Sequence, residues 1–138
     1  MKKISGFYFL LVMIISLTIL PCCSHDQGGA RDISPADAQK LITQQANNPA
    51  FVILDVRTPE EFASGHLANA KNIDYQADDF DSKVGQLDKN KSYLVYCQSG
   101  HRSSGAVSVM KEKGFISLNN LSGGLSHWLE ENLPVITK

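Results

Sequence analysis

The sequence predicts an α/β fold of three layers, in which a central, mainly parallel sheet is flanked by helices. Short apolar runs alternate with capped or amphipathic helical segments along residues 33–138. The runs 51–56 and 93–97 are almost continuously apolar, as expected of strands that are buried on both faces. Strands that alternate with helices indicate one parallel sheet, so we expect a single domain over residues 33–138.

The first half of this domain contains two clear helix starts. A helix is expected over residues 34–46, because Ser34 can cap it and Pro35 suits its first position. The strand 51–56 follows, and Thr58 to Glu61 then form a capping box that starts another helix. A short strand is predicted at residues 71–75.

The second half repeats the alternation. The predicted elements are an acidic helix at 79–87, strands at 93–97 and 117–121, and helices at 103–113 and 125–132. Gly114 closes the helix 103–113, since glycine readily takes the left-handed conformation at a helix end. Functional groups in such sheets lie at the carboxyl ends of strands, where Asp55, Arg57 and Cys97 are found.

The segment from Cys97 to Ser103 is a candidate anion cradle with a nucleophile at its floor. It joins the end of a buried strand to the start of a helix. Inward backbone N–H groups and the helix dipole attract negative charge and lower the pKa of a thiol. Arg102 adds a planar cation suited to an oxyanion. A buried, inert cysteine is the alternative interpretation.

The loop resembles the active loop of the rhodanese family of sulfurtransferases, which reads Cys-x-x-Gly-x-Arg-Ser. Cys97, Gly100, Arg102 and Ser103 match this pattern, with four residues between Cys97 and Arg102. Cysteine phosphatases resemble it too, but their ring is longer because phosphate needs more space. The shorter ring therefore argues against a phosphatase or an arsenate reductase.

Three further segments resemble rhodanese motifs in the same order along the chain. They are the strand that ends in Asp55-Val56-Arg57, the segment Gly65 to Ile73, and the segment Leu121 to Trp128. Asn69 stands where the family usually has glycine. Asparagine tolerates the left-handed backbone better than most residues other than glycine, so we expect the turn to be kept.

The resemblance assigns roles to the candidate site residues. Cys97 is the expected nucleophile, and the active-site loop that binds substrate comprises Gln98, Ser99, Gly100, His101, Arg102 and Ser103. The equivalent arginine in this family can turn inward to a carboxylate, so substrate contact by Arg102 stays open. Asp55 and Arg57 are expected to support the loops by ion pairing. His101 faces either the donor or solvent, and Glu61 is expected mainly to start its helix.

Residues 1–22 are predicted to be a signal peptide. Lys2-Lys3 precede a mostly apolar stretch from residue 7 to residue 20, and Cys22-Cys23 follow. The cysteines resemble the end of a bacterial lipoprotein signal, with lipid on Cys23, or alternatively on Cys22. An uncleaved anchor and an ordinary cleaved signal are the other possibilities. Residues 23–32 are expected to be a flexible tether, and the protein is placed in the periplasm or cell envelope.

Composition narrows the possible partners. Without residues 1–22 the chain has 11 basic and 14 acidic residues, a net charge of −3, and no basic cluster indicates nucleic acid. The four histidines lack the spacing of a metal site, so no metal and no cofactor are expected. The membrane is expected as a partner only through the lipid anchor, and the protein is expected to be a monomer.

The expected function is sulfur transfer by an exported enzyme. A small anionic donor such as thiosulfate would give its sulfane sulfur to Cys97, and a thiol or cyanide, or a partner protein, would remove it. The alternatives are a persulfide or redox carrier with little turnover on small donors, and a domain that only binds.

Overall fold

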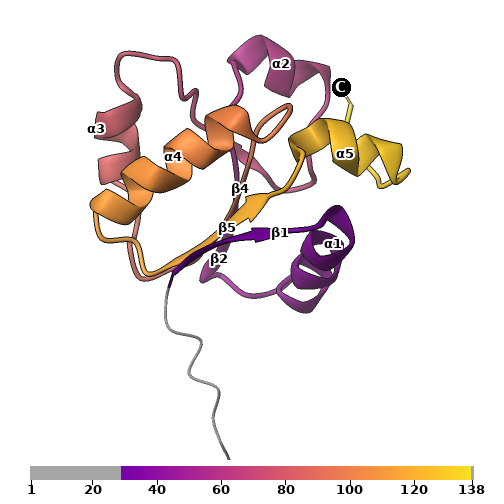
Figure 1. Cartoon of the computed structure of the whole chain (residues 1–138), viewed down its shortest axis with the longest axis horizontal. Coiled ribbons are helices and arrows are strands. Elements are labelled where there is room, and N and C mark those ends of the chain that lie inside the picture. The colour runs from indigo at the N-terminus through magenta and orange to yellow at the C-terminus, as the bar shows by residue number, and fades with distance from the viewer. Residues whose placement is uncertain (1–28, 138) are drawn as a thin grey trace, which may run out of the picture.

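The computed structural model describes residues 29–137, which form one five-stranded sheet with helices on both faces (Figure 1). The strands are β1 (Ala30–Ile33), β2 (Phe51–Asp55), β3 (Lys71–Asn72), β4 (Ser92–Tyr96) and β5 (Ser117–Leu121). Their order in the sheet is β1-β5-β4-β2-β3, and every pair of neighbours is parallel. The predicted fold class is therefore confirmed.

The described residues form five helices, and all but α2 contribute to one of two layers that each cover an apolar cluster. The helices are α1 (Pro35–Gln44), α2 (Pro59–Ser64), α3 (Phe80–Gly85), α4 (His101–Glu112) and α5 (Gly124–Glu130). Val84 of α3 and Met110 of α4 pack with Leu54 of β2 on one face. Ala38 of α1 and Trp128 of α5 belong to the cluster on the other face. Figure 1 shows α3 and α4 on one side of the strands and α1 and α5 on the other.

The predicted local signals begin α1 and α2 and end α4. The Ser34 hydroxyl accepts the backbone N–H of Asp37, and Pro35 is the first residue of α1. Thr58 and Glu61 form the complete, reciprocal capping box of α2. Gly114 ends α4 with a φ of 89°, and Asn69 keeps its turn with a φ of 63°.

The structure corrects three boundaries. Ala30–Ile33 form β1, paired with β5, so residues 30–32 are not part of a tether. β3 has two residues instead of five, although the N–H groups of Ile73 and Tyr75 still donate to the carbonyls of Asp55 and Val56. α4 begins at His101, two residues before its predicted start, because Gly100 with its left-handed backbone is the cap. The predicted signal peptide and Cys23 lie outside the described residues.

No helix within residues 29–137 has the length and apolar character needed to cross a membrane.

Candidate active site

The candidate site lies at the carboxyl ends of the two central strands. Cys97 directly follows the last residue of β4, and Asp55 is the last residue of β2, whose Cα pairs with Tyr96. Each of the two strands has a neighbouring strand on both sides. The sheet thereby places the thiol and the Asp55 carboxylate at one end of the fold, as the sequence predicts.

The thiol of Cys97 sits at the floor of the loop and receives hydrogen bonds there. The residue is 1% exposed, and the backbone N–H of Gly100 donates to its Sγ at 3.1 Å. Burial raises the pKa of the Cys97 thiol, but the Ser103 hydroxyl and the N–H groups of Ser103, Ser99 and Gly100 outweigh it, so the net pKa is lowered. The arrangement therefore favours a thiolate.

Two backbone hydrogen bonds from helix α5 fix the orientation of the peptide groups at the start of the loop. The carbonyl of Cys97 accepts the N–H of Leu125 at 2.8 Å, and the carbonyl of Gln98 accepts that of Ser126 at 2.9 Å. These two carbonyls point away from the thiol because the first N–H groups of α5 hold them. A Cβ on Gly124 would lie 2.5 Å from the Cys97 carbonyl oxygen, so only glycine allows this approach.

Gly100 makes the sharp turn from the loop into α4. Its φ is 94°, and a Cβ there would lie 3.3 Å from the Gly123 nitrogen. The connection between β4 and α4 is consequently Cys97 to Gly100, while His101, Arg102 and Ser103 belong to the first turn of the helix. The expected six-residue active loop thus divides into a short loop, Gln98–Gly100, and a helix start.

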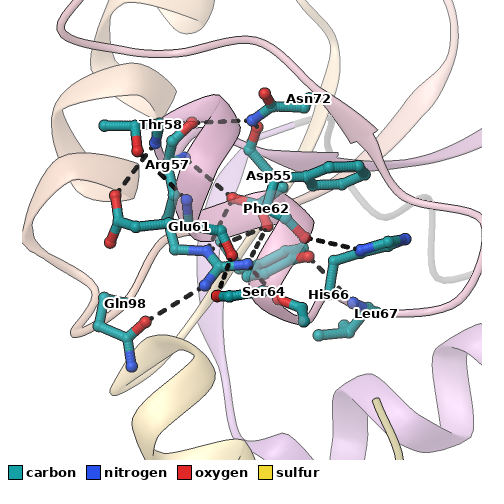
Figure 2. A network of polar contacts seen from close by, with 12 residues as sticks. Asp55, Arg57, Thr58, Glu61, Phe62, Ser64, His66, Leu67, Asn72 and Gln98 are labelled. Atoms are coloured by element: carbon teal, nitrogen blue, oxygen red, sulfur yellow. Dashed lines mark hydrogen bonds and ion pairs between the residues drawn. The ribbon is translucent and has the colours of Figure 1, made fainter. Parts of the chain in front are cut away.

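Arg57 is buried and ties three parts of the site together (Figure 2). Its guanidinium forms the expected ion pair with Asp55, with 2.6 Å between Nη2 and Oδ2. The same Nη2 donates to the carbonyl of Gly65 at 2.6 Å, and Nη1 donates to the Gln98 side-chain oxygen at 3.3 Å. Removing either member of the pair would leave an uncompensated buried charge, which costs about 3–5 kcal/mol.

Gln98 bridges both walls of the site. Its amide oxygen accepts from Arg57, and its amide nitrogen donates to the Ser126 hydroxyl at 3.0 Å. Both ends of the side chain are thus used for support, which makes Gln98 a brace within the loop.

Arg102 turns toward α2. Nη1 and Nη2 each lie 2.7 Å from one carboxylate oxygen of Glu61. This hydrogen-bonded pairing with Arg102 lowers the pKa of Glu61 to about 2. The inward carboxylate that the resemblance implies is therefore Glu61, a residue whose expected role is mainly to start its helix.

The remaining loop residues differ in exposure. Ser103 is fully buried, whereas Ser99 and His101 are exposed at the rim. Within residues 29–137, no three His, Cys, Asp or Glu side chains are grouped so that they could hold a metal ion.

Comparison with known proteins decides the family. A match to the Rhodanese-like domain family covers residues 34–131. The chain belongs to the rhodanese family. This rhodanese-like domain is 35% identical over 104 residues to the putative sulfurtransferase YtwF of Bacillus subtilis, covering 75% of this chain and 95% of that protein. It is 30% identical over 96 residues to the thiosulfate sulfurtransferase GlpE of Stutzerimonas stutzeri, covering 67% and 85%.

Solved structures agree with the rhodanese assignment. A rhodanese-related protein from Thermoplasma volcanium superposes with a TM-score of 0.65 at 32% identity, over 78% of this chain and 99% of that one. A rhodanese-like domain protein from Staphylococcus aureus gives a TM-score of 0.62 at 30% identity, over 78% and 98%.

Sequence reasoning missed two groups of supporting residues in this rhodanese site. One is Glu61, the partner of Arg102. The other is the pair Gly124 and Ser126, which shapes the loop from α5. The Gly-Gly motif is visible in the sequence, but nothing in it indicates which backbone atoms the glycines approach.

Proposed function

We propose that this protein transfers sulfane sulfur through a persulfide on Cys97. The observation that carries the proposal is the thiol itself: it ends a central strand, has a lowered pKa, and accepts the Gly100 N–H at 3.1 Å. Stabilised thiolates of this kind are nucleophiles. The two named sulfurtransferase relatives, YtwF and GlpE, support the same reaction class.

The reaction proceeds in two half-reactions. The Cys97 thiolate attacks the outer sulfur of a donor such as thiosulfate, an S–S bond forms, and sulfite leaves with the electron pair of the broken bond. An acceptor thiolate or cyanide then attacks the outer sulfur of the persulfide and restores the Cys97 thiolate. The N–H groups of the loop are placed to stabilise the anionic sulfur in both forms.

A second candidate function is a sulfur carrier that a partner protein loads. The pairing of Arg102 with Glu61 favours the carrier, because both terminal nitrogens of the guanidinium already donate to the Glu61 carboxylate. The loop then offers a small anionic donor mainly its N–H groups and the exposed His101. Weak binding of thiosulfate would make delivery of sulfur by a protein the faster route.

The proposal includes export, with a lipid on Cys23 and a place in the periplasm or cell envelope. It is supported by Lys2-Lys3, the apolar stretch that follows, and the Cys22-Cys23 pair. Cys97 is a free thiol within residues 29–137. A free thiol in an oxidising compartment is a reactive group and not half of a structural disulfide.

Mass spectrometry after incubation with thiosulfate tests the proposal. The full chain should gain about 32 Da, one sulfur atom, on the peptide that contains Cys97. Cyanide should remove the adduct, Cys97→Ser should show none on that peptide, and the matched variant Cys23→Ser should keep it. An unmodified Cys97 peptide would overturn the sulfur-transfer mechanism. Repeated thiocyanate formation supports the enzyme, and a single turnover supports the carrier.

A further inference from the structure

A cavity of about 230 Å³ lies near the amino ends of the central strands, whereas Cys97 lies at their carboxyl ends. The end of α1, the turn into β2, the first half of β2, and Asn69, Lys71 and Lys91 form its walls. None of its lining residues belongs to the candidate active site. Its volume is below the ~300–1,000 Å³ that is usual for drug-sized ligands, so a fitting ligand is small.

The floor of this cavity is apolar. Ile53 of β2 is 6% exposed, and Ile42 of α1 and Phe51 of β2 pack against the same core cluster. The cavity stays open on the β3 side of β2 because β3 pairs only with Leu54 and Asp55, so Phe51–Ile53 have a strand, β4, on their other side alone. A ligand entering here would bury an apolar body against the core.

The mouth of the cavity is positive. Lys71 and Lys91 line it, and no aspartate or glutamate does. Among the described residues, neither lysine takes part in an ion pair or a side-chain hydrogen bond. Of the five other lysines within residues 29–137, three pair with an aspartate and two do not.

We infer that this cavity binds a small amphipathic carboxylate, with its apolar body on Ile42, Phe51 and Ile53 and its carboxylate between Lys71 and Lys91. Apolar contact provides most of the affinity, and the two ammonium groups select the charge. We expect ligand binding in the cavity not to depend on Cys97, since the cavity shares no lining residue with the candidate active site.

Residue-resolved NMR titration of the full chain with octanoate tests this inference. Amide shifts should saturate at the cavity residues, while octylammonium, a cation of similar length, should leave them unchanged. Lys71→Gln and Lys91→Gln should each weaken octanoate binding about two- to five-fold, the worth of an exposed ion pair. Lys89→Gln removes the same charge from a lysine outside the cavity and should leave binding unchanged.

Two further variants separate the possible results. Ala46→Phe adds bulk at the exposed mouth and should abolish octanoate shifts while the protein stays folded. Cys97→Ser should bind octanoate as the natural chain does, whether or not sulfur transfer is established. Equal shifts with octylammonium, no saturation at the cavity residues up to about 10 mM octanoate, or unchanged binding in both lysine variants would each overturn the inference.

Discussion

Glu61 and Arg102 are joined by two parallel hydrogen bonds of 2.7 Å, which connect the first turn of α2 to the first turn of α4. Glu61 Oε2 also accepts the backbone N–H of its own cap residue, Thr58. One carboxylate therefore closes the α2 cap and holds the arginine of the active loop. The geometry makes Arg102 a brace of the loop, and the main-chain N–H groups remain as the principal anion donors.

The pairing predicts an acid-dependent loss of stability. The pKa of Glu61 is about 2 in the folded protein, against an ordinary value of 4.5. A lowered carboxyl pKa adds stability that is fully present above 4.5 and is lost as the pH falls toward 2. The free energy of unfolding, measured with urea, should exceed that of Glu61→Gln at pH 6, and this difference should shrink between pH 4.5 and 2.

Glu60→Gln is the matched control for that experiment, because Glu60 is the exposed neighbour without the arginine contact. Its difference from the natural chain should be small at every pH. A difference for Glu61→Gln that stays constant from pH 6 to pH 2 would contradict the role of the ion pair.

Ser103→Ala should raise the pKa of the Cys97 thiol. The Ser103 hydroxyl is the largest of the groups that lower this pKa, and the residue is buried. Without this hydroxyl the Cys97 thiolate loses a hydrogen bond that favours the charged form, so its pKa should rise. The midpoint of the iodoacetamide alkylation rate against pH measures it.

Ser104→Ala is the control for this substitution, because the hydroxyls of Ser103 and Ser104 both donate to the Gly100 carbonyl, but only Ser103 also lowers the pKa of the thiol. Its alkylation midpoint should stay near that of the natural chain. Equal midpoints for the two variants would show that the Ser103 hydroxyl does not stabilise the thiolate.

Gly124→Ala should damage both stability and the site. The added Cβ would lie 2.5 Å from the Cys97 carbonyl oxygen, at a left-handed φ of 60°. We expect a loss of about 2–4 kcal/mol in the free energy of unfolding, together with a raised Cys97 pKa, because the contact of α5 with the loop must open.

Gly85→Ala tests whether the effect is specific to that position. Gly85 lies in α3 with nothing within 4 Å of the added Cβ. This variant should be neutral or more stable by about 0.5–1 kcal/mol. If Gly124→Ala behaves in the same way, the close approach of α5 to the loop is not required.

Insertion of one glycine between Gly100 and His101 should sharply reduce sulfur transfer from thiosulfate. The insertion moves the left-handed cap, Gly100, away from the start of α4, so we expect the hydrogen bond from the Gly100 N–H to the Cys97 sulfur to be lost. The same insertion between Ala46 and Asn47, in an exposed turn, should leave turnover intact. Full activity after the first insertion would show that ring size does not set the chemistry.

Cys23→Ser should abolish incorporation of labelled palmitate and release the protein from membranes. Lipoproteins of the resembling type carry two or three chains, which hold firmly at about 0.8 kcal/mol per buried CH₂. Labelling that survives Cys23→Ser but not Cys22→Ser would place the lipid on Cys22. A soluble, unlabelled mature protein would contradict anchoring and indicate an ordinary cleaved signal.

Local sequence alone determines the alternation of strands and helices after β1, the starts of α1 and α2, and the end of α4. Ser34 and Thr58 cap their helices through N–H groups three residues away, and Gly114 stops α4 through its own backbone. The position of Cys97 at the end of a buried strand follows from the apolar run before it. These features depend on residues within one turn of each other, so the sequence was enough to predict them.

Tertiary structure decided which groups meet. Glu61 and Arg102, like Arg57 and Gln98, are 41 positions apart, and the sequence does not indicate that they touch. β1 escaped prediction because Ala30–Ile33 is short and exposed and becomes a strand only beside β5. A charged side chain pairs with the polar groups that the fold brings within about 3 Å of it. The long-range packing of strands and helices therefore decides whether an arginine supports a loop or faces a substrate.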